Sequence, residues 1–387
     1  MPDQSPALTL TLHASIHDIT QQAWDSCAGP DNPFVSHAFL ACVEDSGSAG
    51  KRTGWLPRHA ALRDEAGSLL ACAPMYAKGH SYGEYVFDHG WARAYEQAGG
   101  RYYPKLQVAV PFSPVPGPRL LINPTSHLPP AALADALAQA CQQMQVSSVH
   151  VTFCQQAEYA ALGAAGWLQR LGLQYHWHNN DYAGFDDFLA ALNSRKRKSI
   201  RRERRDAQSA GLEFVTLRGP EITKADWAAF YRFYESTVDR KWGSAYLTPE
   251  FFPLLGERLG ARVVLMLARQ GAGWVAGALN LAGRDALYGR NWGTIGEFPF
   301  LHFELCYYRA IDFAIAQKLA RVEAGAQGEH KIQRGYLPAL TYSAHYIADR
   351  HLRHAVDQFL REERPARMAD MAALGELSPY RQAGETS

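Results

Sequence analysis

The chain has 387 residues, of which 47% are apolar, and 39 basic against 38 acidic residues give a formal net charge of +1. This length suggests two domains, and the balanced charge excludes global electrostatic steering of a charged partner. No apolar run approaches the roughly 20 residues of a membrane span, and the first residues lack the pattern of a secretory signal. Six scattered cysteines without a CxxC pair are expected to be reduced thiols in a cytoplasmic protein.

The first half alternates predicted strands and helices. A strand is predicted at residues 9–13. A hairpin is predicted over 58–78, with strands at 58–63 and 68–78 joined by a turn at 64–67. The polar and aromatic segment 79–88 is expected to extend this sheet. Further predicted strands cover 146–153 and 171–178, and predicted helices cover 20–28, 36–45, 91–98, 129–145 and 158–165.

A strongly basic segment, residues 193–211, follows. Eight of its eleven residues from Arg195 to Arg205 are Lys or Arg, and the good helix formers predict a helix. Its arginines suit phosphate oxygens, so we expect a docking surface for the phosphates of RNA, a nucleotide sugar or a cofactor. The residues proposed to bind phosphate are Arg197, Arg201, Arg204 and Arg205. The alternative is a solvated helix at a domain boundary, as most charge runs are.

The second half repeats the order of elements. Helices are predicted at 227–239 and 249–259, a hairpin over 262–282 and a strand over 285–292, in which Tyr288 and Arg290 share a face. A turn with Gly293 and Gly296 precedes a helix over 300–318, then a strand over 320–325. The repeat predicts an α/β (α+β) fold of two units, each a mostly antiparallel mixed sheet flanked by helices. The expected boundaries are 1–180, a basic connector at 181–211, and 212–387.

The helix at 300–318 is apolar almost all round, yet it carries Glu304 on one stripe with Tyr308, Ile311 and Ile315. A buried carboxylate must either gain a higher pKa or meet a cation. The loop after the next strand concentrates Glu329, His330, Lys331 and Arg334 among glycines.

Together, the segments LHFELCYYRAIDFAIAQKLARVEAGAQGEHKIQRGYLP and KGHSYGEYVFDHGWARAY resemble the FemAB-like predicted N-acyltransferases. This resemblance covers roughly residues 34–363. It implies two GNAT-like units, as in the peptidoglycan aminoacyltransferases, and acyl or aminoacyl transfer to a small-molecule or peptide amine in the cleft between them. The implied co-substrate is acyl-CoA or aminoacyl-tRNA, with no permanently bound cofactor, and a tRNA would dock through the basic helix.

GNAT enzymes bind the CoA pyrophosphate at a helix N-terminus after a Q/R-x-x-G-x-G/A turn. The matching place here runs from Arg290 through Gly293 to Gly296, one residue too long, with Glu297 where an anion would lie. We therefore expect a donor other than CoA, although Gly293 and Gly296 stay candidate donor-binding residues.

Transfer to an amine needs a base that takes the ammonium proton. Glu304 is the first candidate, and its alternative is a structural acid paired with Lys331 or Arg290. Glu329 and His330 are the second candidates, although a loop histidine is often bonded to backbone. His302 is a further candidate because it lies four residues before Cys306, as in a Cys–His pair, but Cys306 is more often a packed apolar group there. Lys331 and Arg334 would clamp an anionic ligand or merely neutralise nearby acids.

Side chains that would contact the acceptor occur in both halves. Arg290 and Trp292 end a strand and are expected to line the cleft. In the first half a mixture of rings and charges suits a polar, sugar-like or peptide-like acceptor. Its members are Lys78, His80, Tyr82, Glu84, Tyr103 and Lys105. The alternative is an aromatic core whose hydroxyl groups find local partners.

Two other function classes stay open. One is a non-catalytic protein that binds a cell-wall precursor or RNA. The other is a metal-dependent hydrolase with ligands among His302, Glu304, Glu329 and His330, which ranks low because no HExxH occurs and we predict no bound metal. Kinases and dehydrogenases are disfavoured because neither GxxxxGK[ST] nor GxGxxG after a strand occurs. The oligomeric state has no signature in the sequence.

Overall fold

The computed structural model describes residues 8–241, 245–325 and 328–381. The chain divides into two compact units, the first formed by Met1–Gly172 with Leu340–Met368 and the second by Leu173–Ala339 with Ala369–Ser387. The predicted division at residues 180 and 211 follows chain order, whereas the compact units do not. Strands β9 (Leu168–His178) and β15 (Leu337–Ile347) and helix α12 (Arg350–Glu376) each belong partly to both units.

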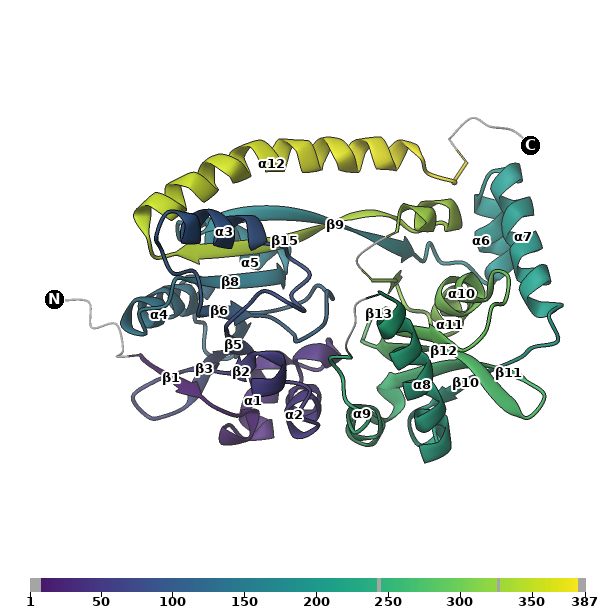
Figure 1. Ribbon diagram of the computed structural model, residues 1–387, viewed down its shortest axis with the longest axis horizontal. Helices are drawn as coiled ribbons and strands as arrows, with labels where there is room; N and C mark the ends of the chain where they lie inside the picture. The colour runs from purple at the N-terminus through teal and green to yellow at the C-terminus, as the bar shows by residue number, and fades with distance from the viewer. Residues whose placement is uncertain (1–7, 242–244, 326–327, 382–387) are drawn as a thin grey trace. The chain divides into compact units, whose positions relative to one another are not determined.

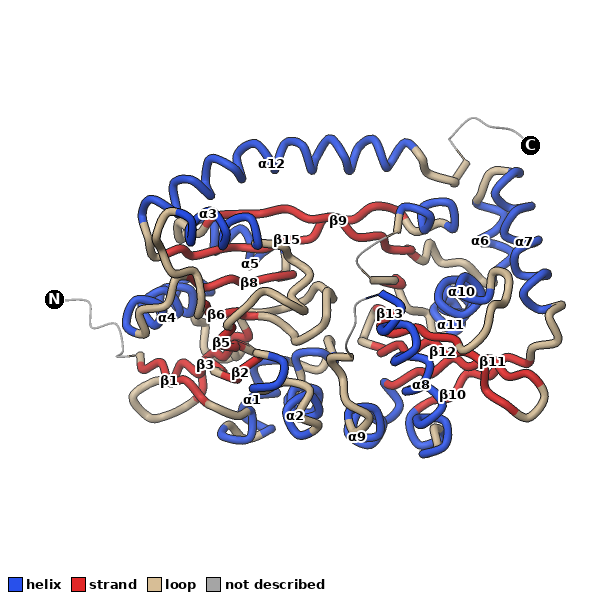
Figure 2. The backbone as a smooth tube through the Cα atoms, in the orientation of Figure 1, coloured by secondary structure: helices blue, strands red, loops and turns tan. Residues whose placement is uncertain are grey.

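The first unit contains two groups of paired strands (Figures 1 and 2). A four-stranded sheet has the order β1-β3-β4-β7, with bounds Thr9–His13, His59–Arg63, Leu69–Ala73 and Leu121–Ile122. The second group has the order β15-β8-β6-β5-β2. Its strands other than β15 are β8 (Ser148–Cys154), β6 (Lys105–Val108), β5 (Met75–Lys78) and β2 (Trp55–Pro57). The predicted hairpin strand over 68–78 is therefore two strands in different sheets. Pro74 separates them, because proline has no N–H to donate to a sheet ladder.

Two helices of the first unit begin with hydroxyl caps. Thr20 caps α1 (Gln21–Ala28) and Ser36 caps α2 (His37–Asp45) through their hydroxyl oxygens. The others are α3 (His89–Gln97), α4 (Pro130–Gln143) and α5 (Gln156–Ala164), and Leu133, Leu137, Val149 and Val151 lie in the core that they cover. The prediction that residues 79–88 extend the sheet is wrong: β5 ends at Lys78 and the segment is a loop leading to α3.

The second unit is built on strands in the order β10-β11-β12-β13-β14-β9. The predicted hairpin is confirmed as β11 (Val263–Gln270) and β12 (Gly273–Ala282), flanked by β10 (Glu213–Arg218) and β13 (Ala286–Thr294). These four strands are antiparallel, whereas β13 and β14 (Arg321–Glu323) are parallel. The connection between the parallel strands carries helices α10 (Leu301–Phe303) and α11 (Arg309–Ala316) (Figure 1).

Other helices of the second unit are α6 (Phe185–Ala191), α7 (Ser194–Gln208), α8 (Lys224–Lys241) and α9 (Phe251–Leu259). Its core packs Leu305 and Ile311 against the sheet residues Met266, Leu287 and Val322. The predicted fold class, a mixed α/β protein with two units of mainly antiparallel strands, is confirmed. Among the residues that the structure describes, no helix combines the length and apolar character needed to cross a bilayer.

Candidate active site

A bulge in β13 redirects the strand before it reaches the site. Leu279 of β12 pairs with Asn291 and Asn280 pairs with Gly289, so Arg290 is the extra residue. Because a bulge shifts the alternation of side chains by one, Leu287 and Trp292 both pack in the core on the helix side of the sheet. The sequence-based alternation, which placed Tyr288 and Arg290 on one face of a regular strand, missed this bulge.

The predicted continuous helix over 300–318 is interrupted. Between α10 and α11 lies one π-helical turn, η6 (Glu304–Tyr308). A π turn accommodates one extra residue and is common at functional sites. Consequently His302 and Tyr307, five residues apart, have ring centroids separated by only 5.2 Å.

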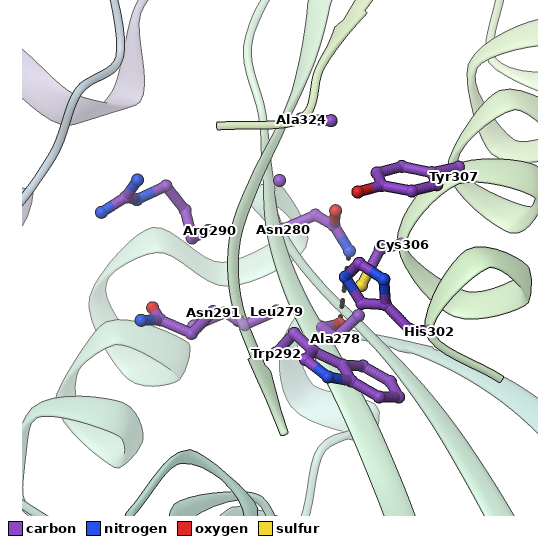
Figure 3. Close-up of a pocket in the computed structure, with 11 residues that line it drawn as sticks. Ala278, Leu279, Asn280, Arg290, Asn291, Trp292, His302, Cys306, Tyr307 and Ala324 are labelled. Carbon is purple, nitrogen blue, oxygen red and sulfur yellow. Dashed lines mark hydrogen bonds between the residues drawn. The ribbon is translucent and has the colours of Figure 1, made fainter. Parts of the chain in front are cut away.

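Bulge and π turn together build a pocket of about 110 Å³, which lies within the second unit. Figure 3 shows the His302 ring between Trp292 and Asn280, close to Cys306, while Arg290 and Asn291 point away from it. The amide nitrogen of Asn280 donates to the Ala278 carbonyl at 3.3 Å. The lining residues are Ala278, Leu279, Asn280, Gly289, Arg290, Asn291, Trp292, His302, Cys306, Tyr307 and Ala324.

Tyr307 connects the pocket to the loop predicted to carry chemistry. Its hydroxyl oxygen lies 3.0 Å from Nε2 of His330, which belongs to the 3₁₀ helix η7 (Glu329–Arg334). Burial, and then the cations Arg334 and Lys331, lower the pKa of His330 below its ordinary 6.5. Burial raises the pKa of Tyr307 well above its ordinary value. At neutral pH the pair is thus a neutral phenol beside a neutral imidazole, and His330 is exposed to solvent.

Glu304 meets cations other than those expected. Its carboxylate is fully buried and accepts from Arg204 Nε at 3.1 Å and Nη2 at 3.2 Å, and Arg309 Nε lies 3.3 Å away. Neither Lys331 nor Arg290 is among these partners. Glu304 does not line the pocket, and neither does the exposed Glu329. The geometry gives Glu304 the role of an anchor between α7 and the π turn.

Arg334 and Lys331 are held within the second unit. Arg334 makes a two-pronged ion pair with Glu203 of α7, at 3.1 and 2.9 Å, and its guanidinium lies 3.4 Å from the centroid of the Phe303 ring. The hydroxyl of Tyr308 donates to the same carboxylate. Lys331 donates to the Gly325 carbonyl at 3.0 Å, and burial lowers its pKa to about 8.

The arginines proposed to bind phosphate divide into two groups. The predicted helix is confirmed as α7, and Arg204 faces inward, bonded to Asp312 at 2.6 Å as well as to Glu304. Arg201 and Arg205 are exposed beside Asp186 and Asp206, and Arg197 is half-buried. Arg204 is thus held in ion pairs within the second unit, whereas Arg201 and Arg205 face solvent.

Neither glycine of the expected donor turn presents an amide to an anion. Gly293 lies inside β13, where a Cβ atom would come within 2.0 Å of the Phe233 carbonyl oxygen of α8. Close packing of this helix against the strand thus explains why glycine occupies the position. The Gly296 amide donates to Thr294 Oγ1 at 3.2 Å.

In the first unit, the candidate acceptor residues form a buried ionic network. Lys105 is fully buried and donates to Glu84 at 2.7 Å and to Asp88 at 2.5 Å. Lys78, also fully buried, donates to the Tyr82 carbonyl and lies 3.9 Å above the Trp55 ring. Burial lowers the pKa of Lys78 to about 7 and raises that of Glu84 to about 7.

The remaining members surround this network. Tyr103 bonds to Ser81 at 2.9 Å, His80 accepts from the Tyr82 amide at 3.2 Å, and the Tyr82 side chain is exposed. Sequence reasoning assembled these residues correctly but missed Tyr307 and Asn280 in the second unit. Asn280 stands in no recognisable motif, whereas Tyr307 lies in the segment LHFELCYY that carries the family resemblance. Among the described residues, no group of three or more His, Cys, Asp or Glu side chains is placed to hold a metal ion.

We compared the whole chain with known proteins. The structure is similar to FemX (TM-score 0.54, 11% identity), over 91% of this chain and 100% of that chain. It is also similar to the C-terminal domain of a putative lysylphosphatidylglycerol synthetase from Agrobacterium fabrum (TM-score 0.52, 10% identity, 90% and 97% covered). A conserved protein of unknown function from Bacteroides thetaiotaomicron gives a TM-score of 0.51 at 9% identity, with 87% and 99% covered.

At these identities the structural likenesses establish the fold alone. No curated protein matches the sequence. A family model described as peptidoglycan biosynthesis/recognition does match, and it spans residues 15–382. The chain therefore belongs to the FemAB-like family.

Proposed function

We propose that this protein is an N-acyltransferase that moves an acyl or aminoacyl group from an activated donor to an amine, in the pocket around His302, Cys306 and Tyr307. The observation that carries the proposal is the contact between the Tyr307 hydroxyl, which lines the pocket, and the exposed His330. Membership of a family described as peptidoglycan biosynthesis/recognition supports a peptidoglycan precursor as the acceptor.

The reaction needs one proton to leave the attacking amine. The amine nitrogen forms a bond to the donor carbonyl carbon, and the bond from that carbon to the donor oxygen or sulfur breaks. The amine proton passes to the Tyr307 oxygen while the phenol proton passes to His330 Nε2. His330 then releases it to water or to the leaving group. A placed acid–base group of this kind contributes about 10²- to 10⁴-fold to the rate.

The donor is an aminoacyl-tRNA or an acyl-CoA. Because the Gly296 amide already donates to Thr294 Oγ1, we favour the aminoacyl-tRNA. The exposed arginines of α7 are placed to meet its phosphates. Glu304 is assigned a structural role, since two guanidinium groups hold its carboxylate and it does not line the pocket.

Neighbouring tyrosines of the π turn provide the test. Purified protein is incubated with acyl-CoAs or aminoacyl-tRNAs and peptidoglycan precursors, and products are identified by mass spectrometry. Tyr307→Phe is expected to lower the transfer rate by about 100-fold or more and to retain ligand binding. Tyr308→Phe, which removes a hydroxyl bonded to Glu203 outside the pocket, is expected to lower stability by about 2 kcal/mol and to keep transfer.

A protein that recognises cell-wall precursors without chemistry is the second candidate, because the family description includes recognition. It would bind a precursor equally well with either tyrosine replaced and would form no product. Equal loss of transfer in both variants would contradict the assigned relay.

A further inference from the structure

A second and larger pocket adjoins the one described above. It has a volume of about 550 Å³ and shares Trp292 and His302 with the smaller pocket. These two rings therefore border both pockets. Its remaining lining residues are Thr294, Gly296, Glu297, Phe298, Pro299 and Leu301.

The two pockets differ in chemistry. The smaller one is lined by amide, imidazole, thiol and phenol groups, whereas Phe298, Pro299 and Leu301 form apolar walls in the larger one. Beside these walls Ile295 is 58% exposed. Apolar side chains gathered at a surface hollow indicate an apolar ligand. Among the described residues that line the larger pocket, only Glu297 is acidic, and it is exposed.

The segment that carries Phe298 is held by its own hydrogen bonds. Thr294 Oγ1 accepts from the Gly296 amide at 3.2 Å and donates to the Gly296 carbonyl at 3.0 Å. A Cβ atom on Gly296 would lie 2.7 Å from the Phe298 ring, so glycine allows the ring to fold back against the backbone. The apolar wall is thus formed before any ligand binds.

We propose that the larger pocket binds the apolar acyl group of the donor, with its carbonyl carbon beside Trp292 and His302 in the smaller pocket. This inference rests on the proposed acyl transfer and specifies the acyl group. The apolar chain has two possible sources, a medium-length fatty acyl thioester or a hydrophobic aminoacyl ester. Only the second carries an ammonium group for the Glu297 carboxylate.

The test measures affinity against chain length. Isothermal titration uses two probe series on the full chain: acetyl-, hexanoyl- and decanoyl-CoA, and glycinamide, leucinamide and phenylalaninamide. Affinity is expected to rise with apolar size in one series, by up to about fourfold per added methylene. Phe298→Ala is expected to remove about tenfold of the affinity of the longest member and less than about twofold of the shortest.

Phe87→Ala is the matched control, because Phe87 is exposed in the first unit and lines neither pocket. Glu297→Gln distinguishes the sources: it weakens binding about threefold only if the amino acid amides are the series that responds. Affinity that is independent of chain length, an equal effect of Phe298→Ala and Phe87→Ala, or no binding by either series would overturn the inference. Size-dependent binding without transfer to any amine would leave the pocket assignment intact and contradict the proposed function instead.

Discussion

Two regions of this protein gather titratable side chains in different surroundings. In the first unit, Lys78, Glu84, Asp88 and Lys105 form a sealed cluster in which opposite charges meet one another. In the second unit, His302, Cys306 and Tyr307 face a pocket of about 110 Å³. Titratable residues in the sequence therefore do not define a site by themselves. What decides is whether the side chains are enclosed with ionic partners or line a pocket.

We expect the sealed cluster to affect the stability of the folded protein. A fully buried charge is tolerated only when it is paired and hydrogen-bonded, and Lys105 is bonded to two carboxylates and to Ser81. In the proposed function the pocket carries the chemistry, because the pKa of Tyr307 is raised and the pKa of His330 is lowered, so both groups are neutral at neutral pH. Substitutions in the two regions should accordingly affect different measurements.

The largest effect is expected from Lys105→Met, which leaves Glu84 and Asp88 buried without their main cation. Removing one partner of a buried ion pair costs about 3–5 kcal/mol, measured as the free energy of unfolding in urea. Lys51→Met is the control, because Lys51 is exposed in the same unit, and it should change stability by less than about 0.5 kcal/mol. Coincident unfolding curves for the two variants would remove the distinction drawn above.

The pH dependence of transfer sharpens the comparison next. The pKa of His330 is lowered below 6.5, so the imidazole stays neutral down to that lowered value and kcat/KM should fall only at more acidic pH, as it gains a proton. His330→Asn should lower kcat/KM by about 100-fold at pH 7 and abolish this acid limb. His127→Asn, at an exposed position of the first unit, should reproduce the wild-type profile. An acid limb that survives in His330→Asn would assign the titration to another group.

Glu304→Gln separates anchoring from catalysis within the second unit. The amide keeps the shape of the carboxylate but weakens its bonds to Arg204 and Arg309, so stability should fall by about 2 kcal/mol. Transfer by the folded variant should stay within about threefold of wild type. A loss of about 100-fold at unchanged stability would instead make Glu304 the base.

The smallest effect is expected on the exposed face of α7. Replacing Arg201 and Arg205 with Gln should change stability by less than about 0.5 kcal/mol. It should also reduce the salt dependence of aminoacyl-tRNA affinity by about one unit of log K per log [salt] for each phosphate that the variant no longer binds. Arg93→Gln with Arg101→Gln, two exposed positions of the first unit, is the control. If wild type, the α7 variant and the control variant all showed the same salt dependence of affinity, α7 would be a solvated helix without a role in binding.

Much of the architecture could be predicted from sequence periodicity. The hairpin of β11 and β12, the basic helix α7 and the burial of Glu304 all follow from residue patterns. The bulge at Arg290 and the π turn at Glu304–Tyr308 do not, because each adds one residue to a regular element and is fixed by packing against neighbours. These two irregularities bring Trp292 and Tyr307 into the pocket. Trp292 was expected to line a cleft because it ends a strand, whereas Tyr307 was missed because its position depends on the π turn.

Ionic partners were equally hard to assign. The sequence predicts that a buried Glu304 needs a cation, but its partner Arg204 is 100 residues away, and Arg334 is 131 residues from Glu203. Charge identity alone cannot choose among the chain's 39 lysines and arginines. One local signal was available: Ile200, Glu203 and Ala207 share a helical face, and all three are buried.

The path of the chain constrains when the first unit can become complete during synthesis. Its strand β8 pairs with residues 342–347 of β15, and Arg170 forms an ion pair with Glu363 of α12. A ribosome must therefore translate the whole of the second unit's main segment, Leu173–Ala339, before these partners emerge. Until then, the edge of β8 that pairs with β15 has no partner strand in the nascent first unit. The second unit, by contrast, has most of its strands in one continuous stretch of sequence. The first unit can thus be completed only after the main segment of the second unit has been synthesised.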